Sequence, residues 1–266
     1  MNRISVSGVV LAVWVLVALS APWLPLHPDR ISLPAILDTP GMGSWLGNDD
    51  LGRPVLDRLL IGARTSFWVA GCVVSLSLLA GTLVGSTAAY LGGRWDRVLV
   101  MLLDVFMAFP GILLAIALAG LLGPGIGNLV LALSLVGWVG FARLARAQVL
   151  SLKRREHVQA AQALGTPTTA IVRRHLVPLI AAPLLIEGTF AVAAVVIAES
   201  GLSFLGLGVQ PPEASWGSMI RDGVRYLLVA PHLVLAPGLS LFLVVLSVNL
   251  LGDRLRDRLD VRGEQA

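Results

Sequence analysis

The chain has 266 residues, of which 56% are hydrophobic and only 14% are charged, and its formal net charge is +4. A soluble domain of this length does not need so much apolar surface, so the composition predicts an all-α integral membrane protein. The basic residues are almost all arginine and form no stripe with interleaved aromatic residues, which argues against a nucleic-acid partner. Cys72 stands alone and the histidines are scattered, so we expect no internal disulfide, metal site or cofactor.

The first apolar run extends from Gly8 to Leu24 and is long enough to cross a membrane. We interpret residues 1–24 as an uncleaved N-terminal transmembrane helix. The alternative is a secretory signal peptide, because Ala18-Leu19-Ser20 is similar to a small-residue cleavage site. In both cases the polar segment that follows, residues 25–65, is expected to form a periplasmic loop. Its last part, Pro54 to Ala63, has the pattern of a short amphipathic helix on the membrane surface.

Five further apolar spans follow at residues 66–91, 98–122, 126–142, 176–198 and 232–251. Together with the first they predict six transmembrane helices, a core at residues 66–251 and a tail at residues 252–266. Fourteen of the twenty Lys and Arg residues fall in the segments on the N-terminal side of the membrane. Because Lys and Arg favour the cytoplasm, both termini and residues 153–178 are expected inside, with residues 199–231 outside.

Several residues inside or beside the spans are unusual for a membrane helix. Gly71, Gly81 and Gly85 would let a neighbouring helix approach closely. Pro110 interrupts the third span, either as a bend that lines a path or as a packing kink. Asp104 and Glu187 are charged at membrane depth, so each should face the bundle or a wet cavity, and a structural role is favoured for both. The candidate pathway or gate residues are Asp104, Pro110, Glu187, Glu199, Ser203 and Phe204.

The loop at residues 199–231 has two parts. Leu202 to Val209 is apolar and predicts a partly buried re-entrant or interfacial segment. Ala214 to Arg225 follows two prolines and predicts a short surface helix.

The polar stretch from Lys153 to Pro178 predicts two short helices around a sharp corner. Val158, Ala161 and Leu164 have helical spacing and form a narrow apolar stripe. Gly165 follows as a residue able to adopt a positive φ at a helix end. Thr166 is expected to be the N-cap of the next helix and Pro167 its first residue. From these residues alone, an ordinary basic cytoplasmic loop remains the alternative.

This stretch resembles the cytoplasmic loop of ABC-importer permeases, whose pattern is Glu-Ala-Ala, three residues, Gly, nine residues, Ile-x-Leu-Pro. Ala160, Ala161, Gly165 and Pro178 match, whereas Gln159, His175 and Val177 depart from it. Three other runs resemble the C-type permeases of dipeptide, oligopeptide and nickel importers. They are WLGNDDLGRPVLDRLLIGAR at 45–64, SFLGLGVQPP at 203–212 and NLLGDRLRD at 249–257.

The resemblance implies the type I ABC-importer permease fold, with a cytoplasmic coupling helix, in a bacterial or archaeal inner membrane. It implies half of a pathway for peptides or a related small solute, with nickel or a nickel chelate as the alternative. The implied partners are a second homologous permease, two ATPase subunits or domains, an external solute-binding protein and membrane lipid. The implied ATPase-docking residues are Glu156, Gln159, Ala160, Ala161, Leu164, Gly165, Thr166 and Pro178.

The chain has no Gly-x-x-x-x-Gly-Lys-Ser/Thr run, so we expect no ATP hydrolysis by this chain itself.

Two other classes of protein remain open alongside a transport subunit: a secondary transporter and an intramembrane hydrolase. A secondary transporter would need internal repeats and coupling-ion carboxylates at the midplane, and no repeat is found. An intramembrane hydrolase would need a nucleophile with a base. Gly201-Leu202-Ser203 is only weakly similar to a nucleophile motif.

Overall fold

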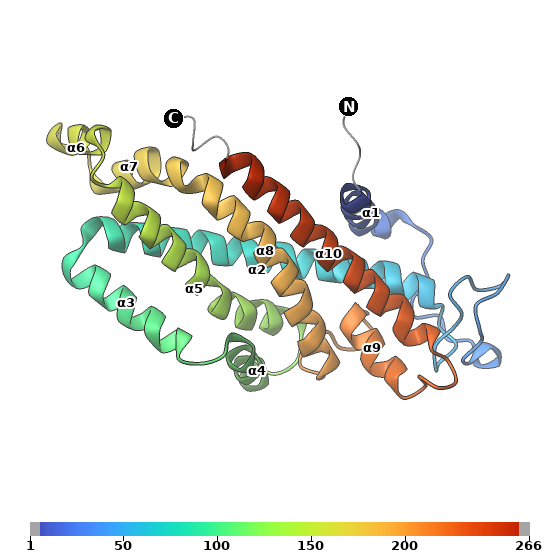
Figure 1. The fold of residues 1–266 in the computed structure, drawn as a ribbon. Coiled ribbons are helices and arrows are strands. Elements are labelled where there is room, and N and C mark those ends of the chain that lie inside the picture. Colours follow the sequence, from blue (N-terminus) through green and yellow to red (C-terminus); the bar gives the residue numbers. More distant parts are fainter. Residues whose placement is uncertain (1–5, 261–266) are drawn as a thin grey trace, which may run out of the picture.

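The computed structural model describes residues 6–260, and this part of the chain is largely helical (Figure 1). The α-helices are α1 (Val6–Ser20), α2 (Val55–Leu91), α3 (Gly93–Met107), α4 (Gly111–Leu122), α5 (Ile126–Leu152), α6 (Glu156–Ala163), α7 (Thr168–Ile171), α8 (Val177–Phe204), α9 (Trp216–Val224) and α10 (His232–Asp260). The shorter elements are two 3₁₀ turns, η1 (Ala21–Trp23) and η2 (Leu33–Ala35), and a π-helix, η3 (Val172–Leu176).

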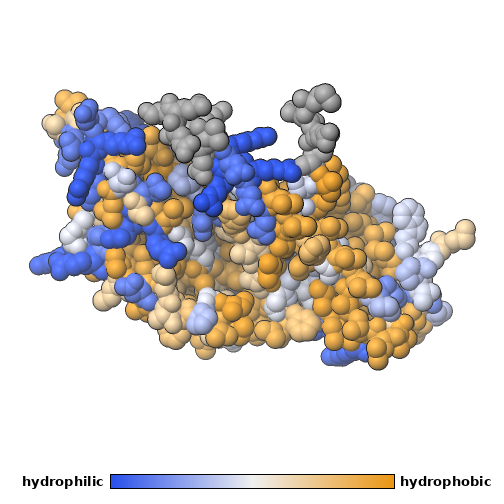
Figure 2. Space-filling view, in the orientation of Figure 1, coloured by the Kyte–Doolittle hydropathy of each residue, from blue (hydrophilic) through white to orange (hydrophobic). Residues whose placement is uncertain are grey.

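The long helices have the length and composition of membrane spans. Within residues 6–260, five helical segments meet that description, and the pair α3 and α4 makes a sixth if it is counted as one bent span. Hydrophobic residues cover the middle of the face seen in Figure 2, and hydrophilic residues gather where α6 lies. Large apolar side chains such as Leu79 and Leu239 are more than half exposed, as expected beside lipid. The predicted all-α membrane architecture is confirmed.

The bundle has two distinct ends (Figure 1). We call one the α6 end: α5 ends there, α8 begins there and α10 ends there. The start of α1 lies beside the end of α10, because Arg254 Nη1 donates to Ser7 Oγ at 3.3 Å. We call the other end the α9 end: it holds α9 and the segment between α1 and α2.

Helix α2 packs closely against α5 through two of the predicted glycines. A methyl group at Gly81 or Gly85 would collide with the α5 backbone near Trp138 and Ala142. At Gly71, by contrast, an added methyl group would have no atom of another element within 4 Å among residues 6–260. The predicted close approach is therefore confirmed at Gly81 and Gly85, and the described part of the chain leaves Gly71 without a neighbouring helix.

Helix α2 also begins earlier than the sequence predicted, because Pro54 to Ala63 does not form a separate surface helix. Its first turns run without a break into the membrane-spanning part, and Val55 and Ala63 are buried. Two tryptophan indoles hold these turns: Trp14 Nε1 donates to Ala63 O at 3.0 Å, and Trp216 Nε1 donates to Leu59 O at 3.1 Å. Hydropathy marks only the apolar part of a helix, so the polar ends of α2, α5, α8 and α10 extend beyond their predicted spans.

The predicted break in the third span is present. Helix α3 ends at Met107, α4 begins after Pro110, and the two axes are bent by 86°. Proline has no backbone N–H and disfavours helical geometry in the residue before it, which explains why the helix stops here. Asn128 Nδ2 then donates to Leu122 O at 2.8 Å and to Gly123 O at 3.1 Å, so it satisfies carbonyl groups at the end of α4.

Candidate functional site

The segment between α5 and α8 projects at the α6 end (Figure 1). Gly165 has φ of +76°, so the predicted left-handed turn after α6 is confirmed. The N-cap prediction is wrong: α7 begins at Thr168 and its N-cap is Pro167. The backbone N–H of Thr166 instead donates to Ala161 O at 3.1 Å, so this residue closes the end of α6 rather than starting α7.

The predicted apolar stripe on α6 is correct for two of its three residues. Val158 and Ala161 are buried in a hydrophobic cluster with residues of α5, α7, η3 and α8. The exposed fraction of Leu164 is 86%, because the chain turns away from this cluster at Gly165. Glu156, Gln159 and Ala160 are also exposed. Among the sequence-predicted docking residues, the outward surface therefore includes Ala160 and Leu164, whereas Ala161 faces the chain's own core.

Polar contacts attach the base of this segment to the rest of the bundle. Lys153 Nζ donates to Ala89 O at 3.0 Å, near the end of α2. Arg146 on α5 makes a bidentate pair with Asp96 on α3, with donor–acceptor distances of 2.6 Å and 2.8 Å. Pro178 lies in the first turn of α8, directly after the π-helix η3. These contacts join the base of the segment to α2 and join α5 to α3.

Glu199, near the end of α8, is fully buried and hydrogen-bonded. Ser66 on α2 donates to Oε2 at 2.8 Å, Ser203 donates to Oε1 at 2.8 Å, and Ser200 donates to Oε2 at 3.4 Å. Ser203 Oγ in turn accepts from the backbone N–H of Val209 at 3.2 Å. The structure therefore brings together two predicted pathway residues, Glu199 and Ser203, in a network that joins α2, α8 and the segment after α8.

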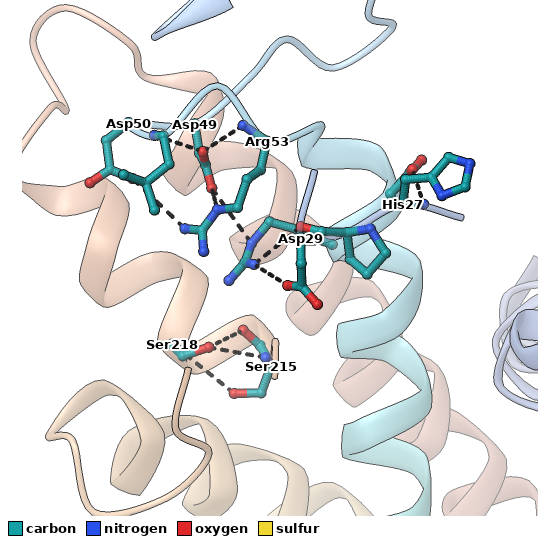
Figure 3. A network of polar contacts seen from close by, with 11 residues as sticks. His27, Asp29, Asp49, Asp50, Arg53, Ser215 and Ser218 are labelled. Carbon is teal, nitrogen blue, oxygen red and sulfur yellow. Dashed lines mark hydrogen bonds and ion pairs between the residues drawn. The ribbon is translucent and has the colours of Figure 1, made fainter. Parts of the chain in front are cut away.

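A second polar network lies at the α9 end and was not singled out from the sequence (Figure 3). Asp49 accepts from Arg53 Nε at 2.7 Å and from the Arg53 backbone N–H at 2.9 Å. Arg58, whose side chain is 4% exposed, lies 3.6 Å from both Asp49 and Asp29. The available signal was the dense alternation of acidic and basic residues in the run at 45–64. Ser215 and Ser218 cap the start of α9 in the same region.

Glu187 lies in the middle of α8 and lines a cavity of about 270 Å³ between α2, α5 and α8. The lining residues are Val74, Ser77, Gly137, Phe141, Glu187, Phe190, Ala191, Ala194 and Val195. Within residues 6–260 the Glu187 side chain makes no hydrogen bond or ion pair. The remaining candidates lie elsewhere: Asp104 is exposed on α3, Pro110 is at the bend, and Phe204 is 41% exposed at the end of α8.

Comparisons with known proteins agree with this architecture. Residues 77–263 match the family described as "Binding-protein-dependent transport system inner membrane component". The chain is 38% identical over 253 residues to the nickel transport system permease protein NikC of Escherichia coli K12, covering 95% of this chain and 91% of that protein. It is 37% identical over 262 residues to the dipeptide transport system permease protein DppC of Alkalihalophilus pseudofirmus, covering 97% and 86%.

A solved structure shows the same fold at lower identity. The inward-facing MetNI methionine ABC transporter matches with a TM-score of 0.55 at 18% identity, over 74% of this chain and 95% of that chain. This likeness extends the agreement from the sequence to the arrangement of the helices.

Proposed function

Because this chain belongs to the binding-protein-dependent transport system inner membrane components, we propose that it forms half of a translocation pathway driven through α6 by a separate ATPase. It is a permease subunit of a binding-protein-dependent importer. The proposal adds which residues receive the ATPase, how the chain lies in the membrane, and which solutes it carries.

The observation that carries the proposal is the placement of α6. This helix projects from the bundle and exposes Ala160, and the 86% exposed Leu164 follows directly after it. Its residues Val158 and Ala161 are buried against α5, α7, η3 and α8. Ala160 has almost no side chain, so another surface can approach the α6 backbone closely, and Leu164 beside it offers an apolar contact. The buried face and the Arg146–Asp96 pair would let a load on α6 move α3, α5 and α8 together.

The orientation follows from charge. Arg154, Arg155, Arg173 and Arg174 lie in or beside the segment that contains α6. Because Lys and Arg favour the cytoplasmic side, we infer that the α6 end faces the cytoplasm, together with both termini. The ATPases would then meet α6 where ATP is present, and the α9 end would meet the solute-binding protein outside.

The proposed solute is a peptide or a related small molecule, with nickel or a nickel chelate as the second candidate. The support is that the relatives include a dipeptide permease and a nickel permease at nearly equal identity. A second homologous permease would complete the pathway. The chain itself would be non-catalytic, since it lacks a phosphate-binding Gly-rich loop with Lys and Ser or Thr.

The docking proposal is tested by two matched leucine variants in the complex coexpressed with its partner permease, ATPases and binding protein. Leu164→Ala at the α6 end should weaken ATPase retention during purification by about tenfold or more, because it removes an apolar contact from the joint. Leu228→Ala removes an even more exposed leucine (98% exposed), just after α9 at the α9 end, and should leave retention unchanged.

Two more variants sharpen this test. Ala160→Trp should also release the ATPase, because bulk on the outward face separates the surfaces, and Gln159→Glu, which restores the family residue, should be tolerated. Ala161→Trp is unsuitable because Ala161 is buried within this chain. Equal ATPase retention in Leu164→Ala, Ala160→Trp and the unchanged complex would contradict docking at α6. ATP hydrolysis by the purified chain alone would contradict the non-catalytic role.

A further inference from the structure

We propose that Glu187 selects cations in the translocation pathway, with its carboxylate contacting a positively charged group of the passing solute. This inference rests on the proposed permease function and names a chemical class for the solute. The group is an ammonium or a metal cation, which are the positively charged groups of the two proposed kinds of solute.

The depth of Glu187 fits a pathway residue. It lies ten residues after the start of α8 and seventeen before its end. At the helical rise these separations correspond to about 15 Å and 25 Å, which places the carboxylate well inside a hydrocarbon layer of about 30 Å. A charged side chain at that depth normally faces a bundle interior or a water-filled cavity, and it marks a substrate or ion path.

The carboxylate of Glu187 is not compensated by its own chain. It forms no hydrogen bond or ion pair within residues 6–260, and the cavity lining contains no basic residue. Apart from Glu187, the only polar side chain in that lining is Ser77, whose hydroxyl is 3.5 Å from Ser134 O. A cation that enters the cavity meets no basic residue in its lining that would repel it, and the carboxylate is the group placed to contact it.

Glycines let α5 lie close to Glu187 and Ser77, where a larger side chain would intrude. Two glycines of α5 face the cavity region: a methyl group at Gly140 would lie 3.4 Å from Glu187 Oε1, and one at Gly137 would lie 2.7 Å from Ser77 Oγ. The cavity volume of about 270 Å³ exceeds the roughly 30 Å³ that one water occupies in the liquid several times over. It therefore has room for a small cationic group together with waters.

The first experiment uses probes of known charge and does not depend on the identity of the solute. Ala191 lines the same cavity one helical turn after Glu187, so Ala191→Cys reports the local potential. In a Cys72→Ala background, the assembled complex is treated with a cationic trimethylammonium or an anionic sulfonate methanethiosulfonate reagent. Each rate is divided by the rate of the same reagent with a free thiol in solution.

The cation-to-anion rate ratio should be well above one and should fall by about tenfold in Glu187→Gln, while Glu187→Asp should preserve it. Glu213→Gln, a matched change on the exposed loop before α9, should leave the ratio unchanged. A ratio that is the same with Glu187 and with Gln would overturn the proposal, and so would failure of both reagents to reach the thiol introduced by Ala191→Cys.

The second experiment identifies the source of the charge by uptake of labelled dialanine and labelled nickel in cells that lack other importers. A fall of about fivefold or more for dialanine in Glu187→Gln supports recognition of an ammonium, and an equal fall for nickel supports a metal cation. Unchanged uptake in Glu187→Gln overturns cation selection but leaves the permease function intact. Absence of uptake of both probes by the unchanged complex counts against the proposed solutes, and the thiol ratio then decides charge selection alone.

Discussion

Glu187 and Glu199 lie on the same helix, α8, twelve residues apart, yet their carboxylates have opposite surroundings. Glu199 is fully buried and accepts hydrogen bonds from Ser66, Ser200 and Ser203. Glu187 is half-buried, lines a cavity and has no partner within residues 6–260. The difference indicates two roles for a carboxylate in such a helix. It either accepts hydrogen bonds from its own chain and holds helices together, or it has no partner in the chain and can contact a solute.

The two sites also differ in what surrounds the helix. Near Glu199 the packing is dense: a methyl group at Gly217 would overlap the backbone of Ser200. Near Glu187 a methyl group at Gly140 would meet only the end of the Glu187 side chain, 3.4 Å from Oε1, beside the cavity. We therefore assign Glu199 to the stability of the α9 end and Glu187 to the solute.

The largest expected effect separates the two carboxylates directly. Glu199→Leu should lower the free energy of unfolding by about 3 kcal/mol or more, because several buried hydroxyl groups lose their acceptor at about 1–3 kcal/mol each. Glu187→Leu should change it by less than about 1 kcal/mol, since no partner is lost. The measurement is thermal or denaturant unfolding of the purified complex in detergent. Equal destabilisation by both variants would contradict the claim that the chain holds Glu199 but not Glu187.

A smaller effect is expected from adding one methyl group beside each carboxylate. Gly217→Ala should destabilise the protein by about 1–3 kcal/mol, because the methyl group has to displace the Ser200 backbone. Gly140→Ala should change stability by less than about 0.5 kcal/mol, because the added methyl group would meet only the Glu187 carboxylate, which can move. The same unfolding measurement applies. If Gly140→Ala lowered the free energy of unfolding more than Gly217→Ala, the expected difference between the two sites would be contradicted.

The smallest effect compares one hydroxyl group in each site. Ser66→Ala removes a 2.8 Å hydrogen bond to Glu199 and should cost about 0.6 kcal/mol, the average for interhelical hydrogen bonds in a membrane, and at most about 1.7 kcal/mol. Ser77→Ala removes only the 3.5 Å contact with Ser134 O and should cost about 0.5 kcal/mol or less. A double-mutant cycle of Ser66→Ala with Glu199→Gln isolates the coupling energy. A coupling energy of zero would remove Ser66 from the network.

The sequence determined those features that depend on a few neighbouring residues. The apolar spans, the break at Pro110, the positive φ at Gly165 and the short helix α9 were all predictable, because hydropathy, a missing N–H and a missing Cβ act locally. The hypothesis that this segment docks an ATPase also came from the sequence, through the spacing of Ala160, Ala161, Gly165 and Pro178.

Only the tertiary structure decided which side of each element meets a partner. The stripe through Val158, Ala161 and Leu164 was divided between core and surface by the turn at Gly165 and by the packing of α7 and η3 on α6. The sequence placed Glu187 inside the span 176–198 and Glu199 at the start of the loop that follows, but it did not show which carboxylate has partners. Glu199 is satisfied by Ser66, which is 133 residues away along the chain, and Glu187 faces a cavity that three helices form together. Burial and hydrogen bonding of this kind depend on residues far apart in sequence, and only folding brings those residues together.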